Sequence, residues 1–232
     1  MDLGLVKAGH KIVYANDNDK DSIETYTKYF SKKFKISPSH IHLNDIKKEK
    51  LKDIPDGDVI VGGFPCQGFS IANTFRKDKR KMERKNNDLY LEMIRIIKGK
   101  KPKYFIAENV PGILSLGGYA NKDAKKKKTG RIFTSVLSDF KKIGYKIKWQ
   151  ILNAAEFGVP QSRRRVIILG TRKDIKNDLV HPQPTHSIED DLFLKKTPNL
   201  WDAISDLEKI KLGDKKILNH QGSKHKVKFN GY

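Results

Sequence analysis

The segment of residues 58–66 is Asp58-Val59-Ile60-Val61-Gly62-Gly63-Phe64-Pro65-Cys66, and its pattern indicates the class of fold. Its β-branched run predicts a buried strand, and the glycines and proline that follow predict a tight loop at the strand's carboxyl end. In a parallel sheet, the carboxyl ends of the strands are where functional loops gather. The sequence therefore places Cys66 at the active edge of a sheet.

Outward from this loop, strand-like and helix-like stretches alternate along the chain. Besides residues 58–61, we expect strands at 11–16, 104–107, 145–152 and 166–169. We expect helices at 19–30, 88–98 and 132–143, where apolar residues recur at helical spacing. This alternation favours an α/β fold with a mostly parallel sheet covered on both faces. After about His181 prolines interrupt the pattern, and only 200–210 is predicted as a short helix before a basic tail.

The charge of the chain points to a polyanionic partner. Its 232 residues include 48 Lys and Arg against 27 Asp and Glu, which gives a net charge of +21. Such an excess attracts nucleic acid and binds it with release of counterions. The alternative is that many of these lysines, such as those at 125–128, lie in a solvated loop.

The composition also indicates in which cellular compartment the protein is found. No apolar run approaches the roughly 20 residues that span a bilayer, and Met1-Asp2-Leu3-Gly4 has no features of a secretory leader. We therefore expect a cytoplasmic protein without a membrane partner, associated with the nucleoid through its basic charge.

Cys66 is the only cysteine, so it forms neither an internal disulfide nor a multi-cysteine metal site. We expect no metal. An inert core thiol and a reactive thiol remain as interpretations. The glycine-rich turn and its basic surroundings favour a thiolate, which makes Cys66 a candidate nucleophile.

Three motifs in order resemble those of the cytosine-C5 DNA methyltransferase family. Residues 62–70, Gly-Gly-Phe-Pro-Cys-Gln-Gly-Phe-Ser, resemble its nucleophile motif. Glu108-Asn109-Val110 resembles its Glu-Asn-Val motif, and residues 161–165, Gln-Ser-Arg-Arg-Arg, resemble its Gln-x-Arg-x-Arg motif. The resemblance implies a Rossmann-like methyltransferase fold, with a catalytic core over 1–175 and a segment at 176–232 that leads toward a target-recognition region.

The resemblance also implies the chemistry. Cys66 would add as a thiolate to carbon 6 of cytosine and thereby activate carbon 5 for methylation. Glu108 would supply a proton or hydrogen bond at N3, if its strand lies beside that of Cys66. Arg163 and Arg165 would support the site from one face of an extended segment. A structural role remains open for Glu108, and we expect Arg164 to be a solvated charge.

The implied cofactor is S-adenosylmethionine. An acid at a strand's carboxyl end, as at Asp17, can accept hydrogen bonds from ribose hydroxyls, although Asp45 could equally be a turn residue. The residues that the resemblance assigns to the cofactor are Asp17, Asn18, Asp45, Ile46, Phe64, Pro65 and Leu89.

The implied substrate is double-stranded DNA with the target cytosine flipped out of the stack. The basic stretch 70–87 fits a mobile loop that closes over the base and binds phosphates; without substrate, the same residues fit a polar loop. The residues assigned to DNA are Pro65, Gln67, Ser70, Arg76, Arg80, Asn109 and Val110.

Departures from the family pattern are also visible. Family members open with a strand and a Phe-x-Gly-x-Gly-Gly turn, and residues 1–5 resemble the segment just after that turn. Neither a recognition region nor the family's C-terminal helix is identifiable before Tyr232. These departures imply a fragment that lacks the first strand, binds the cofactor weakly and does not methylate DNA at a useful rate on its own.

Other interpretations stay open. The chain could be a tRNA cytosine-C5 methyltransferase, an inactive DNA-binding fragment, or half of an enzyme completed by a complementary polypeptide. A cognate restriction endonuclease could accompany it. A thiol protease is a remote alternative, since His181 and His186 lie in loop-like sequence.

Overall fold

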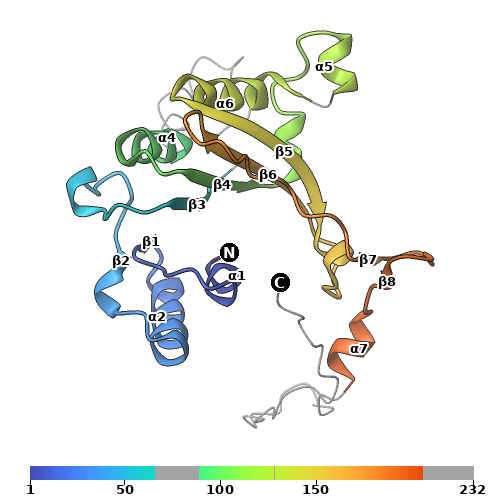
Figure 1. Ribbon diagram of the computed structural model, residues 1–232, viewed down its shortest axis with the longest axis horizontal. Coiled ribbons are helices and arrows are strands. Elements are labelled where there is room, and N and C mark those ends of the chain that lie inside the picture. Colours follow the sequence, from blue (N-terminus) through green and yellow to red (C-terminus); the bar gives the residue numbers. More distant parts are fainter. Residues whose placement is uncertain (66–88, 128, 206–232) are drawn as a thin grey trace, which may run out of the picture. The chain divides into compact units, whose positions relative to one another are not determined.

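The computed structural model of the chain describes residues 1–65, 89–127 and 129–205 (Figure 1). The chain divides into two compact units. The first comprises Met1–Gln150 and Val166–His181, and the second comprises Ile151–Arg165 and Pro182–Tyr232.

A four-stranded sheet with the order β3-β4-β6-β5 lies mainly in the first unit, and the end of β5 and the start of β6 belong to the second. The bounds are Val59–Gly63 for β3, Tyr104–Asn109 for β4, Tyr145–Asn153 for β5 and Arg164–Arg172 for β6. β3 and β4 are parallel, whereas β4 and β6 are antiparallel. All four strands lie where the sequence predicted strands. The expected α/β class is confirmed, with β6 as an antiparallel member of the sheet.

A second, smaller sheet pairs β1, Ala15–Asp17, with β2, Ile41–Leu43, in parallel. The expected strand at 11–16 is therefore wrong in its bounds: hydrogen-bonded pairing with β2 begins only at Ala15 and extends to Asp17. The intervening helix α2, Lys20–Phe34, begins as expected at Asp19, whose carboxylate accepts a hydrogen bond from the Ser22 amide at 2.7 Å.

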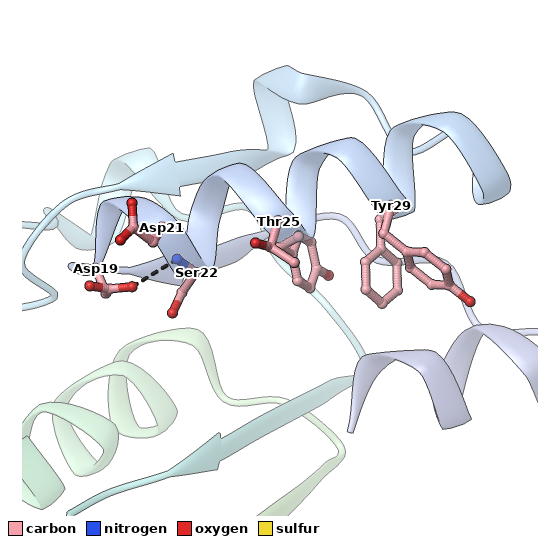
Figure 2. Close-up of a pocket in the computed structure, with 7 residues that line it drawn as sticks. Asp19, Asp21, Ser22, Thr25 and Tyr29 are labelled. Atoms are coloured by element: carbon pink, nitrogen blue, oxygen red, sulfur yellow. Dashed lines mark hydrogen bonds between the residues drawn. The ribbon is translucent and has the colours of Figure 1, made fainter. Parts of the chain in front are cut away.

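Helix α2 extends one turn beyond the predicted end at residue 30 and stops at Lys35, which adopts a left-handed conformation. Stacked and tilted aromatic rings at Tyr26, Phe30 and Phe34 accompany this extension. A groove of about 560 Å³ runs along the helix (Figure 2). The residues that line it are Asp19, Asp21, Ser22, Thr25, Tyr26, Tyr29 and Phe30. Beside the groove, Tyr26 Oη donates to Asp2 of α1 at 2.6 Å.

Aromatic side chains fill the core of the four-stranded sheet. The Phe105 ring stacks on Phe140 with centroids 4.5 Å apart and meets Tyr145 edge-on at 5.2 Å. A Cβ on Gly170 would lie 1.9 Å from the Phe105 ring, so only glycine fits opposite it on β6. Helices α4, Leu89–Lys100, and α6, Arg131–Lys142, lie beside the sheet (Figure 1).

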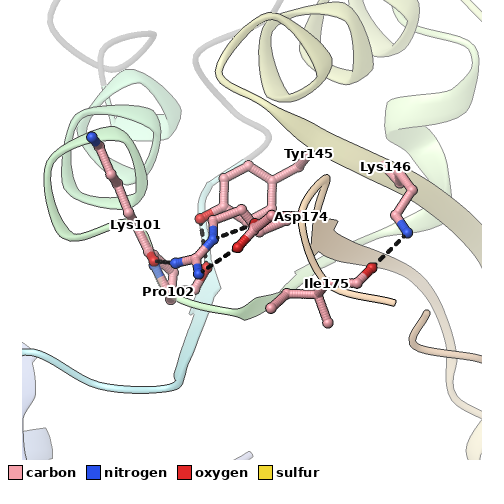
Figure 3. A network of polar contacts seen from close by, with 7 residues as sticks. Lys101, Pro102, Tyr145, Lys146, Asp174 and Ile175 are labelled. Carbon is pink, nitrogen blue, oxygen red and sulfur yellow. Dashed lines mark hydrogen bonds and ion pairs between the residues drawn. The ribbon is translucent and has the colours of Figure 1, made fainter. Parts of the chain in front are cut away.

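Polar contacts close the end of the sheet where β4 begins (Figure 3). Tyr145 Oη donates to the Pro102 carbonyl at 2.7 Å, and burial raises the pKa of Tyr145 to about 12. Arg172 binds Asp174 through Nε at 2.6 Å and also donates to the Lys101 carbonyl. This network lies at the opposite end of β4 from Glu108 and is structural.

The second unit contains short elements. They are η6, Ala154–Phe157; β7, His186–Ser187; β8, Lys195–Lys196; and α7, Leu200–Ile204. Gly158 has φ +82°, and a Cβ there would lie 2.7 Å from the His186 ring, so the ring packs on the glycine backbone. Helix α7 lies at the start of the predicted 200–210 helix, and the rest of that prediction falls outside the described residues.

Several short elements lay outside the predictions. They are α1, Asp2–Lys7; η1, Pro38–His40; η2, Leu51–Asp53; η5, Pro111–Leu114; and α5, Lys122–Lys126. Helix α5 places Lys125 and Lys126 in a helix rather than in a loop, because Asn121 caps it by accepting from the Ala124 amide at 2.8 Å. Both lysines are nonetheless exposed. Among the described helices, none combines the length and the apolar character needed to cross a membrane.

Candidate active site

The carboxyl ends of β3 and β4 bring the predicted catalytic elements together. Gly63 pairs with Glu108 in the parallel register. A Cβ built on Gly63 would lie 3.5 Å from Oε2 of Glu108, so the carboxylate lies over the last residue of β3. Cys66 follows three residues later and lies outside the described residues. The condition that Glu108's strand is adjacent to the strand leading to Cys66 is met.

Asn109 ties the same two strand ends together. Its side chain is buried, with 3% exposed. Its Nδ2 donates to the Phe64 carbonyl at 2.9 Å, while its Oδ1 accepts from the Val110 amide at 2.9 Å. Asn109 therefore fixes the backbone at Phe64, two residues before Cys66 in the sequence. The sequence predicted a substrate contact for Asn109, and this positioning role was missed.

Val110 follows Asn109 directly at the carboxyl end of β4 and is 39% exposed. The chain then turns into η5, where the Ile113 amide donates to the Val110 carbonyl at 3.1 Å. Because η5 buries Ile113 and Leu114, it anchors the backbone after the Glu-Asn-Val motif. The exposed Val110 side chain is compatible with the predicted contact to substrate, which stays a prediction.

The first residues after β3 pack against helix α4. Phe64 is buried, and its ring lies 6.1 Å from that of Tyr90, centroid to centroid. Leu89, a predicted cofactor residue, precedes Tyr90 at the start of α4. Pro65, predicted to contact both ligands, is exposed. Phe64 thus contacts the first turn of α4, which also carries Leu89. The contact is made by Tyr90, a residue that the sequence did not predict for the site.

Tyr90 links this corner to α6. Its hydroxyl donates to Oδ2 of Asp139 at 3.3 Å. Burial and the Asp139 carboxylate together raise the pKa of Tyr90. From the sequence, Tyr90 could have been proposed only because it follows Leu89. Its contact with Asp139 could not, since Asp139 lies 49 residues further along the chain.

The carboxyl ends of β1 and β2 carry the other predicted cofactor residues. Asp17 ends β1, and Oδ1 of its exposed side chain accepts from the Asp19 amide at 2.9 Å. Asp45 follows β2 and accepts from the Lys47 amide at 3.0 Å. Because the strands are parallel, these carboxylates lie at one edge of the small sheet. Asn18 is exposed beside Asp17, and Ile46 is half-buried.

This edge has the chemistry that a nucleoside-bearing cofactor requires. An exposed carboxylate can accept two hydrogen bonds from a ribose diol, and a half-buried apolar side chain can pack on a base. Asp17 and Ile46 supply these two properties at the ends of neighbouring parallel strands. The residues present therefore fit S-adenosylmethionine.

The predicted arginines lie in the second unit. Arg163 is exposed and precedes β6, and its backbone amide donates to Oδ1 of Asn153 at 2.9 Å. Arg165 lies within β6, and its Nη1 donates to the Arg164 carbonyl at 2.8 Å. The extended segment predicted for both therefore begins only after Arg163. Arg164 is exposed, as expected of a solvated charge.

The remaining predicted substrate residues fall outside the described part of the chain. They are Gln67, Ser70, Arg76 and Arg80, together with the rest of the basic stretch 70–87. Their predicted roles stay predictions.

Comparison with known families decides the classification. The model of the C-5 cytosine-specific DNA methylase family matches residues 1–231. The chain belongs to this family. The resemblance drawn from the three motifs is thereby confirmed, and the tRNA methyltransferase alternative is not favoured because the matching family acts on DNA.

Named relatives within the family agree. The Type II methyltransferase M.BspRI of Lysinibacillus sphaericus is 36% identical over 195 residues, which are 84% of this chain and 40% of the relative. The Type II methyltransferase M.NgoFVII of Neisseria gonorrhoeae is 37% identical over 224 residues, which are 93% of this chain and 54% of the relative. The chain spans about half the length of these family members.

A solved structure supports the fold. The crystal structure of the S. pombe Dnmt2 methyltransferase matches with a TM-score of 0.53 and 20% identity, over 77% of this chain and 49% of that chain. The predicted Rossmann-like methyltransferase fold is confirmed by this likeness together with the family match.

Proposed function

We propose that this chain carries the catalytic part of a DNA cytosine-C5 methyltransferase, which transfers a methyl group from S-adenosylmethionine to carbon 5 of a flipped-out cytosine in duplex DNA. The observation that carries the proposal is the pairing of Gly63 with Glu108. It puts a carboxyl group beside the strand that leads, within three residues, to the only thiol of the chain.

In this mechanism Cys66 attacks carbon 6 of the cytosine as a thiolate, and the ring becomes electron-rich at carbon 5. Glu108 protonates or hydrogen-bonds N3 as negative charge develops there. Bound S-adenosylmethionine would supply an electrophilic methyl group on its sulfonium, with the neutral thioether as the leaving group. Loss of the carbon-5 proton and expulsion of the Cys66 thiolate then restore the aromatic ring.

Asn109 acts in this scheme by holding the nucleophile loop in place. Its hydrogen bond to the Phe64 carbonyl keeps the backbone two residues before Cys66 in a fixed position relative to Glu108. Fixing two reacting groups in one geometry lowers the entropic cost of the reaction. In this proposal, Arg163 and Arg165 would stabilise the negative charge that develops on the cytosine ring.

The cofactor would bind across the ends of β1, β2 and β3. The Asp17 carboxylate would accept hydrogen bonds from the ribose hydroxyls, and the Asn18 side chain would donate to the ribose. Asp45 and Ile46 would contact the adenine. Phe64, Pro65 and Leu89 would line the remaining wall of the pocket.

The DNA partner follows from charge. A net charge of +21 suits a phosphate backbone, and Arg76 and Arg80 are suited to phosphate contacts. We further propose association with the nucleoid, and either a cognate restriction endonuclease or a complementary polypeptide as a partner.

Methyl transfer tests the proposal directly. The purified chain, and a longer product of the same reading frame, are each incubated with tritium-labelled S-adenosylmethionine and either duplex DNA or tRNA. We expect label in the DNA only, with weak transfer by the chain alone. Glu108→Gln should slow transfer by roughly two to four powers of ten while DNA affinity stays nearly unchanged. Glu189→Gln is the control, because Glu189 is an exposed carboxylate outside the proposed site.

Two outcomes would contradict the proposal. Equal loss of DNA binding and of rate in Glu108→Gln would make Glu108 a structural carboxylate. DNA binding without any transfer, even after a complementary polypeptide is added, would make the chain a DNA-binding protein that lacks the activity of its family.

A further inference from the structure

The segment of residues 44–49, here called the 44–49 turn, carries Asp45 and Ile46 and is held by side chains from other elements. Asn16 of β1 donates through Nδ2 to the Asn44 carbonyl at 2.9 Å. Within the turn, Asn44 Nδ2 donates to Oε1 of Glu49 at 2.9 Å, and the Lys48 amide donates to the Asp45 carbonyl at 2.8 Å. The turn is therefore shaped by hydrogen bonds rather than by an apolar core.

Arg95 of α4 also contacts the turn. Its Nη2 donates to the Ile46 carbonyl at 3.0 Å, across 49 residues of sequence. Its Nε lies 2.6 Å from Oε2 of Glu92, one helical turn earlier. The guanidinium is planar and its donors are rigidly spaced, so the Glu92 pair fixes the direction in which Nη2 points.

Glu49 is the buried carboxylate of this hydrogen-bond network. It is 8% exposed, and a carboxylate at such a depth is stable only when polar groups satisfy it. Asn44 supplies one of these groups. The Tyr14 ring lies 4.6 Å from that of His42 on β2, centroid to centroid. Burial and the Glu49 carboxylate raise the pKa of Tyr14 well above its ordinary value.

We propose that Arg95 is a positioning residue for the cofactor, which holds the 44–49 turn on helix α4 so that Ile46 and Leu89 face the cofactor from one rigid frame. The inference rests on the proposed assignment of S-adenosylmethionine to this edge. It follows because Leu89 begins the same helix that carries Arg95. Without the guanidinium, the peptide after Ile46 loses its anchor, and the two walls of the pocket move independently.

Three variants of helix α4 test this inference. Binding of labelled S-adenosylmethionine is measured by equilibrium dialysis, at chain concentrations high enough to detect weak binding. Arg95→Met should raise the Kd roughly tenfold, since a charge-assisted hydrogen bond is lost. Arg95→Lys should raise it about threefold, because one ammonium group cannot bind Glu92 and the Ile46 carbonyl with the same geometry. Lys98→Met is the control, with the same charge change on an exposed position of the same helix.

Amide hydrogen exchange separates positioning from general loss of structure. In Arg95→Met, exchange should accelerate in the 44–49 turn and stay unchanged in β4. If exchange also accelerates in β4, the variant is globally destabilised and Arg95→Lys decides the question. Wild-type Kd in a folded Arg95→Met or Arg95→Lys chain would overturn the inference. Wild-type chain that binds no cofactor would refute the cofactor assignment itself, and this inference with it.

Discussion

The four-stranded sheet and the region of residues 1–54 around β1 and β2, here called the β1–β2 region, are held together by different forces. Phe105, Phe133 and Phe140 are fully buried around the sheet. In the β1–β2 region the buried apolar residues are Phe30, Ile36 and Ile54, and each strand has three residues. The edge that carries Glu108 therefore rests on apolar packing, whereas the edge that carries Asp17 and Asp45 has fewer buried apolar residues and is held by a network of hydrogen bonds.

This difference has a functional meaning. Covalent catalysis requires the nucleophile loop and the acid to keep a fixed geometry, which a packed core maintains. Binding a cofactor at the β1–β2 edge depends on a few hydrogen bonds, so local opening there lowers affinity without unfolding the sheet. Substitutions in the sheet should therefore unfold the protein, and substitutions in the β1–β2 region should loosen it locally.

The largest expected effect is that of Phe105→Ala. Removal of a fully buried ring that stacks on Phe140 should lower the free energy of unfolding by about 3–5 kcal/mol. Tyr29→Ala, at a position 40% exposed in the β1–β2 region, is the control and should cost far less. Denaturant unfolding followed by circular dichroism measures both. Similar losses for the two variants would remove the distinction between the regions.

Asn109→Leu should cause the second-largest loss of unfolding free energy. The substitution leaves the buried Phe64 carbonyl without its donor, which costs about 1–3 kcal/mol of unfolding free energy. Asn177→Leu, at an exposed position, is the control. Unchanged stability together with a wild-type methylation rate in Asn109→Leu would refute the role of Asn109 in holding the nucleophile loop.

Asn16→Ala should have a smaller and local effect. Loss of the hydrogen bond to the Asn44 carbonyl should cost about 0.5–1.5 kcal/mol. Amide exchange should accelerate at residues 42–44 while β4 keeps its protection. Equal acceleration in β4 would mean that the β1–β2 region opens only together with the sheet.

The smallest expected effect is a difference in acid sensitivity. The Lys146 ammonium lowers the pKa of Asp178 beside the sheet, whereas hydrogen bonds from Ser22 lower the pKa of Asp19 at the start of α2. Each contribution is present above the ordinary Asp value of about 4 and is lost as pH falls through the lowered folded-state pKa. Salt screens the ion pair more than a helix cap.

Thermal unfolding between about pH 5 and pH 2, with and without about 1 M NaCl, distinguishes the two carboxylates. Asp178→Asn should reduce the acid sensitivity of Tm mainly at low salt, and Asp19→Asn should do so at both salt concentrations. The opposite salt dependence would contradict the assigned causes of the two pKa shifts.

The sheet was largely predictable from sequence because its strands are apolar or β-branched runs, as at 59–61 and 166–169, or contain alternating apolar and polar residues, as at 145–150. The β1–β2 region was not. Strand β2 is the tripeptide Ile41–Leu43, whose extended form depends on pairing with β1. For the same reason the strand expected at 11–16 begins later, at Ala15, where the partner begins.

The candidate site shows the same division. Motif order and an alternating α/β pattern were sufficient to predict that Glu108 lies beside the strand of Cys66. The role of Asn109 toward Phe64 and that of Arg95 toward Ile46 join residues 45 and 49 positions apart. Such contacts are set by tertiary packing, and no local propensity encodes them.

Covalent capture of duplex DNA containing 5-fluorocytosine tests whether Cys66 is the nucleophile. The fluorine at carbon 5 blocks the last elimination, so a thiolate bound to carbon 6 stays attached after methyl transfer. In the presence of S-adenosylmethionine, the chain, or a longer product of the same reading frame, should form a complex that survives denaturing electrophoresis, and Cys66→Ser should form none. A denaturant-resistant complex with Cys66→Ser would contradict the assignment of Cys66 as the nucleophile.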